Sequence, residues 1–92
     1  MRLQGKTALV TGSTSGIGLG IAKAFAAEGA NIIINGFGEA AAIEAERAAL
    51  AVLNGGTAVY DGADLTKPDE IEAMFQRADK DLGGVDILVN NA

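Results

Sequence analysis

The chain has 92 residues, 49% of them hydrophobic, which suits one small domain with an apolar core. Seven basic residues against 12 acidic ones give a net charge of −5, so the sequence lacks the basic surface that nucleic-acid binding needs. Histidine and cysteine are absent, which excludes disulfides, thiolate metal ligands and an imidazole base. We therefore expect no nucleic-acid partner and no metal site.

An apolar run over residues 7–11 predicts the first strand, and a helical pattern follows it over residues 16–28. Ile17, Ile21 and Phe25 are spaced four residues apart, which places them on one face of that helix. A phosphate-binding turn belongs at such a junction of strand and helix.

The following elements are predicted from apolar runs and from the glycines that separate them. Gly29 stands where a left-handed cap ends the first helix, and residues 31–35 form the second strand. Residues 40–53 are rich in Ala, Glu and Leu, which favours a helix that ends at residues 54–56. The third strand begins with residues 57–60.

A third helix and a fourth strand complete the pattern. Thr66 is the expected N-cap of this helix, with Pro68 in its first turn and Asp69 near its positive end. Glycines 83 and 84 end the helix, and residues 85–90 form a buried strand. An apolar stripe at intervals of three and four marks the buried face of this helix: Ile71, Met74, Phe75, Ala78 and Leu82.

Three glycines in the first turn indicate an anion site. Gly12, Gly16 and Gly18 remove Cβ atoms where the turn is tight, where a pyrophosphate approaches the backbone and where the helix packs on the strand. Their spacing differs from Gly-x-Gly-x-x-Gly, and no Gly-Lys-Ser/Thr sequence follows, which argues against a triphosphate P-loop. The glycine pattern alone leaves a chance turn and a binding site equally open.

Two further motifs accompany the turn. Residues 11–18 resemble the cofactor turn of the short-chain dehydrogenase/reductase family, and Asp64-Leu65 and Asn90-Asn91-Ala92 match two other marks of that family. The resemblance implies an α/β fold, a Rossmann-type three-layer sandwich whose parallel sheet has the strand order 3-2-1-4. Residues 1–92 would then be the N-terminal dinucleotide-binding part of a single doubly wound Rossmann domain, ending before its catalytic half.

The resemblance also implies a nicotinamide dinucleotide in a crevice between the first and fourth strands. In the family, the match of Asp64 contacts adenine and the Asn90-Asn91 pair borders the nicotinamide ribose, whereas the residues themselves also fit a turn acid and polar strand ends. Phe37 fits a cover for the adenosine and a half-buried loop anchor equally well. The expected cofactor-binding residues are Gly12, Thr14, Ser15, Gly16, Ile17, Gly18, Phe37, Ala63, Asp64, Leu65, Asn90, Asn91 and Ala92.

The end of the second strand favours NAD over NADP. No Arg or Lys occurs at residues 12–18 or 35–38, so a 2′-phosphate would lack a charged partner. Asn35 is expected to hydrogen-bond a ribose hydroxyl there.

No catalytic residue is expected in this chain. Members of the family use a Ser and a Tyr-x-x-x-Lys motif, whereas Tyr60 is followed four residues later by Asp64 and is interpreted as a packing residue of the third strand. The chain alone is therefore expected to be inactive.

The resemblance is stronger for one group within the family. Residues 12–22, 35–38 and 60–65 are similar to those of bacterial D-3-hydroxybutyrate dehydrogenases, which implies hydride transfer between (R)-3-hydroxybutyrate and acetoacetate, and a short 3-hydroxy acid as substrate. A 3-oxoacyl carrier-protein reductase is the first alternative, and a non-catalytic nucleotide-binding or folding fragment is the second. The fourth strand would be an open edge, so we expect a homo-oligomer or association with a C-terminal half.

The location follows from the apolar runs. Residues 1–6 contain no apolar segment of signal-peptide length, and no apolar run approaches the roughly 20 residues that cross a bilayer. We expect no membrane association and a cytoplasmic location.

Overall fold

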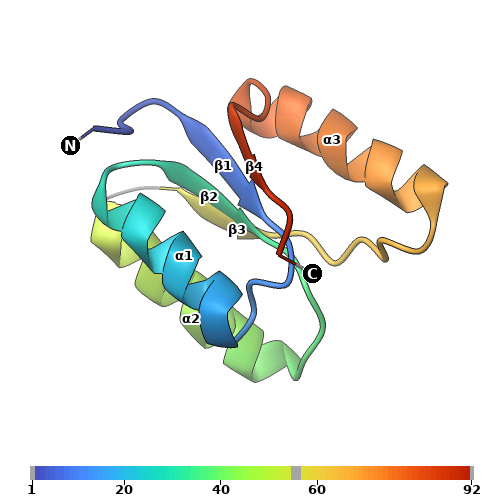
Figure 1. The fold of residues 1–92 in the computed structure, drawn as a ribbon, viewed down its shortest axis with the longest axis horizontal. Helices are drawn as coiled ribbons and strands as arrows, with labels where there is room; N and C mark the ends of the chain where they lie inside the picture. Colours follow the sequence, from blue (N-terminus) through green and yellow to red (C-terminus); the bar gives the residue numbers. More distant parts are fainter. Residues whose placement is uncertain (1, 55–56, 92) are drawn as a thin grey trace.

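Four short strands form one parallel sheet in the computed structural model, which describes residues 2–54 and 57–91 (Figure 1). The strand order is β3-β2-β1-β4, as predicted. β1 pairs in parallel with both β2 and β4, and β2 pairs with β3. The strands are β1 (Thr7–Val10), β2 (Asn31–Ile34), β3 (Ala58–Tyr60) and β4 (Ile87–Val89).

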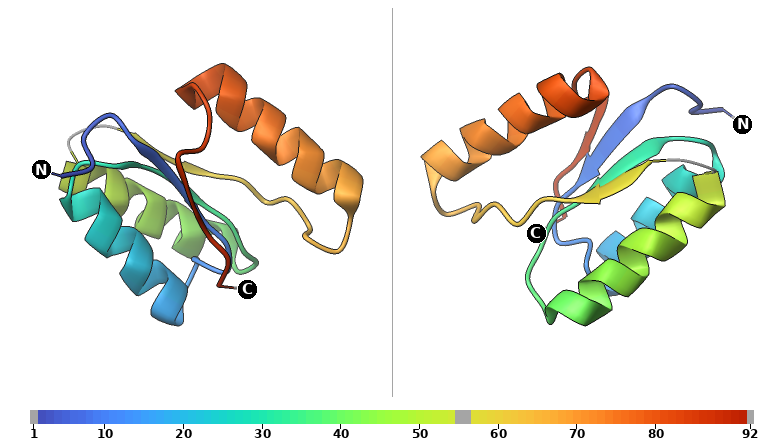
Figure 2. Two further views of the ribbon diagram at one scale, coloured as in Figure 1. Left: turned by 45° about the horizontal axis from the view of Figure 1, so that its top comes forward. Right: turned by 180° about the vertical axis from the view of Figure 1, so that it is seen from behind.

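The three helices cover both faces of the sheet. α1 (Gly16–Ala27) and α2 (Ala40–Asn54) lie side by side on one face, and α3 (Pro68–Leu82) lies on the other (Figures 1 and 2). Since each helix connects two parallel strands, the chain makes three crossovers, two toward β3 and one back across β1 to β4. The predicted three-layer Rossmann-type sandwich is confirmed.

Alternate residues of the central strands supply two apolar clusters, one on each face. Val10 and Ile34 belong to the cluster beneath α1 and α2, whereas Leu9 and Ile33 pack with Met74 of α3. All four β1 residues are buried, as expected for a strand covered by helices on both sides. Burial of these side chains stabilises the sheet and holds the ends of its strands in place.

Small residues form the most deeply buried face of α1. Gly18, Ala22 and Ala26 are its buried residues, whereas Ile17 is 78% exposed and Ile21 is only partly buried. Small side chains let the helix lie close to the sheet, so they occupy the contact face although larger apolar residues stand on the neighbouring one. The apolar spacing therefore predicted the helix correctly, and Ile21 and Phe25 pack against the core whereas Ile17 does not.

The C-terminal ends of α1 and α3 agree with the sequence, whereas Gly55 and Gly56, part of the predicted end of α2, lie outside the described residues. Gly29 and Gly83 follow α1 and α3 with positive φ angles, as their positions predict. α3 begins differently, because Lys67 and not Thr66 is its N-cap. The Thr66 hydroxyl donates to Asp64 Oδ1 at 2.7 Å. The hydroxyl that was expected to cap the helix is therefore bonded to a neighbouring carboxylate instead.

β4 forms one edge of the sheet and is less buried than the sequence predicts. It spans three residues, shorter than the predicted range 85–90, and Leu88 is 56% exposed. Asp86 ties the start of the strand to β1, because its backbone N–H donates to Thr7 O and its carboxylate accepts from Thr7 N. No helix in the described part of the chain has both the length and the hydrophobicity of a membrane span.

Candidate functional site

The loops that follow all four strands meet at the carboxyl edge of the sheet (Figure 1). Val10 at the end of β1 is in register with Ile34 and Val89, and Ile34 is in register with Tyr60. The sequence-predicted site residues therefore lie at one edge, as expected for ligand sites of open α/β sheets. Ala92, which was also predicted, lies outside the described residues.

The start of α1 is open for a ligand. Gly16 has a φ of +61°, and a Cβ added there would meet no atom within 4 Å. Ser15 precedes the helix in an extended conformation and makes no side-chain capping hydrogen bond. An uncapped helix start with N–H groups and open space beside its glycine fits a phosphate of a dinucleotide.

Gly18 serves a different purpose in the same turn. A Cβ at this residue would overlap the carbonyl oxygen of Gly12 and lie 2.6 Å from Nδ2 of Asn91. The glycine therefore allows α1 to approach both the turn and the end of β4, the close packing that the three-glycine pattern predicts.

The residues after β4 hold the turn from the other side. Asn91 N donates to Thr11 Oγ1 at 2.9 Å, and Asn91 Nδ2 donates to Gly12 O at 3.3 Å. The structural interpretation of Asn91 is thus confirmed. Contact of Asn90 and Asn91 with a nicotinamide ribose stays a prediction.

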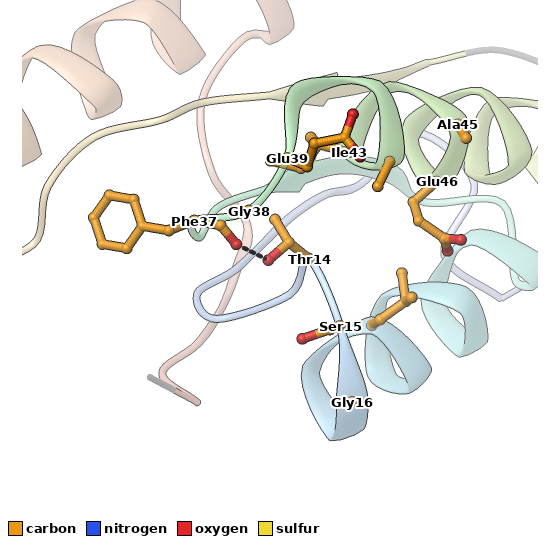
Figure 3. A pocket seen from close by; sticks show the side chains of 11 residues that line it. Thr14, Ser15, Gly16, Phe37, Gly38, Glu39, Ile43, Ala45 and Glu46 are labelled. Carbon is orange, nitrogen blue, oxygen red and sulfur yellow. Dashed lines mark hydrogen bonds between the residues drawn. The ribbon is translucent and has the colours of Figure 1, made fainter.

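The loop between β2 and α2 is anchored through its backbone. Thr14 Oγ1 donates to Phe37 O at 2.8 Å, and the Tyr60 hydroxyl donates to Gly36 O at 2.6 Å. The Phe37 side chain is 73% exposed and points away from Glu39 and the start of α1 (Figure 3). Of the two interpretations of Phe37, the half-buried anchor is therefore wrong, and the adenosine cover stays a prediction. The Tyr60 side chain is more exposed than expected of a packing residue.

Asn35 corrects another prediction. Its side-chain amide donates to Asp61 O at 2.9 Å and to Ala63 O at 3.0 Å, and the residue is only 2% exposed. The amide donors are consumed inside the protein, so they do not bind a ribose hydroxyl.

Ser13, which the sequence analysis did not single out, completes this buried contact. Its hydroxyl donates to Val10 O at 2.6 Å and accepts from Asn35 N at 3.0 Å, while Ser13 N donates to Asn35 O at 2.7 Å. The glycine turn and the end of β2 are thereby locked together. The sequence signals this role only by a small polar residue directly after Gly12.

Asp64 forms a local turn after β3. Its Oδ1 accepts from both the backbone N–H and the hydroxyl of Thr66, and these bonds lower the pKa of the Asp64 carboxyl below its ordinary value. Asp64 N donates to Glu70 Oε1 at 2.9 Å, which ties the loop to the first turn of α3. The turn-acid interpretation is confirmed, and an adenine contact remains compatible with it.

Two hollows flank the glycine turn. One of about 590 Å³ lies between the start of α1 and α2 (Figure 3), and another of about 260 Å³ lies between the turn and the loop after β3. Glu39 and Glu46 line the first, and Asp64 lines the second. Among the described residues that line them, none is Lys or Arg. The carboxylates make these hollows unfavourable for an additional phosphate.

The comparisons with known proteins agree with this geometry. A family model described as short chain dehydrogenase matches residues 6–92. The chain belongs to this family. Its members are oxidoreductases that bind nicotinamide cofactors and act on small molecules.

In the described part of the chain, no group of three or more acidic side chains could hold a metal ion.

Two curated relatives share one name. The D-beta-hydroxybutyrate dehydrogenase of Cupriavidus necator is 65% identical over 91 residues, covering 98% of this chain and 34% of the relative. The enzyme of the same name from Rhizobium meliloti is 52% identical over 87 residues, covering 95% of this chain and 34% of the relative. The chain thus spans about a third of the length of these relatives.

A solved structure shares both the fold and much of the sequence. The short chain dehydrogenase from Burkholderia cenocepacia in complex with NADP superimposes with a TM-score of 0.91 and 43% identity. The match covers all of this chain and 37% of that protein. The family fold is therefore present in this chain at the level of strand order and helix placement.

The bonds from Thr66 predict a pH effect on the loop after β3. In Thr66→Val the Asp64 carboxyl loses its hydroxyl donor, so its pKa should rise toward the ordinary value. Because the folded-state pKa of Asp64 is lowered, its stabilising contribution is present above the unfolded-state pKa and is lost as the pH falls through the folded one.

Carboxyl chemical shifts followed by NMR across acidic pH should show the rise for Asp64. Thr57→Val, at the other end of β3, is the control and should leave that titration unchanged. An unaltered Asp64 titration in Thr66→Val would contradict the assigned cause.

Proposed function

We propose that this chain is the NAD-binding part of an oxidoreductase that interconverts (R)-3-hydroxybutyrate and acetoacetate by hydride transfer. The observation that carries the substrate is the 65% identity to the Cupriavidus necator enzyme across nearly the whole chain. A second relative of the same name supports it at 52% identity. The comparisons do not favour a carrier-protein reductase or a fragment without a catalytic partner.

The domain assignment rests on the same comparison. Residues 1–92 would form the N-terminal dinucleotide-binding part of one Rossmann domain, with the catalytic Ser, Tyr and Lys supplied by the part that these relatives have in addition. Within the described residues, the Tyr60 hydroxyl donates to Gly36 O, and Asp64 stands four residues after Tyr60 where the Tyr-x-x-x-Lys motif has its lysine. Tyr60 therefore does not provide that motif. The remaining expectations, a cytoplasmic oligomer and a short 3-hydroxy acid as substrate, belong to this proposal.

Charge in the two hollows favours NAD over NADP. A 2′-phosphate binds best where Arg or Lys donates charge-assisted hydrogen bonds. The hollows instead hold Glu39, Glu46 and Asp64, and Lys23 of α1 is already paired with Glu46 at 3.6 Å. The NADP in the Burkholderia cenocepacia structure is bound by that protein, so it does not decide the cofactor of this chain.

The residues of this chain would bind and orient the cofactor. The start of α1 would hold the pyrophosphate, the loop after β3 would border the adenosine, and the end of β4 would border the nicotinamide ribose. When bound, NAD supplies the hydride acceptor of the reaction.

Hydride transfer by the complete gene product tests the proposal. With D-3-hydroxybutyrate and NAD, absorbance of the reduced nicotinamide should rise, and kcat/KM with NADP should be at least about tenfold lower, since lost charge pairing of that size is about 1.4 kcal/mol. The L-enantiomer is the matched substrate control.

Faster turnover of an acyl carrier-protein thioester would contradict the proposed substrate. A preference for NADP would contradict the proposed cofactor. Binding of NAD in a calorimetric titration without turnover of any of these compounds would favour the non-catalytic alternative.

A further inference from the structure

The loop over residues 61–65 is held against the sheet by the buried side-chain amide of Asn35 and by one backbone hydrogen bond, from Asp61 N to Ile34 O at 2.9 Å. Both hydrogens of Asn35 Nδ2 are used, one for Asp61 O at 2.9 Å and one for Ala63 O at 3.0 Å. Two further contacts tie the loop to α3: the half-exposed Arg77 side chain donates to the Asp61 carboxylate at 2.8 Å, and Asp64 N donates to Glu70 Oε1 at 2.9 Å. The Asn35 amide is therefore the contact that fixes the Ala63 carbonyl, in the middle of the loop, toward the end of β2.

Ser13 connects the end of β2 to the glycine turn through hydrogen bonds. Ser13 and Asn35 exchange backbone and side-chain hydrogen bonds, and both are buried. The turn that would hold the pyrophosphate and the loop that would border the adenosine are thus joined through the end of β2. An apolar side chain at residue 35 would leave the carbonyl groups of Asp61 and Ala63 without their donor, which is costly inside a protein.

The loop held in this way forms one wall of the smaller hollow. Ala63, Asp64 and Leu65 face Gly12 and Thr14 across it. If the loop leaves this position in part of the protein population, the apparent affinity for the cofactor falls in proportion to the fraction of molecules whose loop stays in place. The opposite side of the site, formed by Asn91 and Thr11, does not depend on the Asn35 amide.

We propose that Asn35 is a positioning residue for the adenosine half of the cofactor, acting through the loop over residues 61–65. This inference rests on the proposed function, because it assumes that the crevice takes a nicotinamide dinucleotide. Asn35 acts on the ligand through the loop carbonyls and does not donate to it.

Two half-ligands test the inference in the complete gene product. ADP-ribose carries the adenosine and the pyrophosphate, whereas nicotinamide mononucleotide carries the other half. In Asn35→Leu, calorimetry should show about tenfold weaker binding of ADP-ribose, the effect expected from about 1.4 kcal/mol of lost hydrogen bonding. Ligand-observed NMR should show nearly unchanged binding of nicotinamide mononucleotide.

The ratio of the two affinities separates positioning from general damage. Partial unfolding lowers the binding of both half-ligands by the same factor, whereas a displaced loop lowers that of ADP-ribose alone. Asn31→Leu, at the start of the same strand, is the matched control and should leave the ratio unchanged. If Asn35→Leu shows no cooperative thermal transition, Asn35→Ser, which retains one donor, should give a smaller shift in the same direction.

Equal losses for both half-ligands, or no loss for ADP-ribose in a folded variant, would overturn the inference. Failure of the unaltered protein to bind either NAD or ADP-ribose would instead overturn the proposed function. The two failures are therefore distinguishable in one set of titrations.

Discussion

Gly18→Ala should destabilise the complete gene product by about 3 kcal/mol, near the upper end of the usual cost of overpacking. The added Cβ would overlap Gly12 O, a backbone atom, and approach Asn91 Nδ2 to 2.6 Å. Since the turn is tied by hydrogen bonds to Asn35 and Asn91, it cannot yield without breaking some of them. Thermal unfolding followed by circular dichroism measures the loss.

Gly20→Ala is the matched control for this prediction. Gly20 belongs to the same helix, and a Cβ there meets nothing within 4 Å. Alanine should stabilise the protein at this position by up to about 1 kcal/mol, because glycine is a poor helix former. Equal melting temperatures for the two variants would show that α1 does not pack against the turn as closely as described.

Gly16→Val should abolish NAD binding within the range of a calorimetric titration while leaving most of the fold intact. A Cβ at Gly16 meets no protein atom within 4 Å, so the valine side chain would extend into the space beside the uncapped start of α1. A pyrophosphate approaching those N–H groups would meet the valine instead. The φ of +61° adds strain of about 1–2 kcal/mol, which lowers the thermal stability moderately.

Gly5→Val separates the strain from the blocked approach. Gly5 also has a positive φ, of +83°, and open space around it, but it precedes β1 at the opposite end of the sheet. It should lose a similar amount of stability and retain full NAD affinity. Undiminished NAD binding by Gly16→Val would sink the assignment of the pyrophosphate to this turn.

The contrast between these two glycines shows what the sequence pattern meant. Both were predicted as cofactor-binding residues because glycines recur at this spacing. In the structure Gly18 is required by the protein itself, whereas Gly16 leaves room for something outside it. The three-glycine pattern predicted both reasons, a pyrophosphate approach and close helix packing, and the surrounding atoms confirm the close packing at Gly18.

For the polar residues Asn35 and Thr66, interpretation from the sequence gave the wrong hydrogen-bond partners. Each was interpreted from its nearest neighbours in sequence, as a ribose-binding group and as a helix cap. Each bonds a different partner: Asn35 reaches carbonyls 26 and 28 residues away, and Thr66 donates to the carboxylate of Asp64. Hydrogen-bonding groups can satisfy several partners equally well, so the choice depends on which one the folded chain brings within reach.

By itself the sequence determined the order of strands and helices, the parallel sheet and the edge at which the candidate site lies. Apolar periodicity and turn residues are local properties, and the crossovers that they imply allow few topologies. The tertiary structure alone decided that α1 rests on Gly18, Ala22 and Ala26, and that Asn35 faces the loop after β3. These outcomes depend on how closely backbones pack and on which donors meet which acceptors, quantities that arise only when distant segments come together.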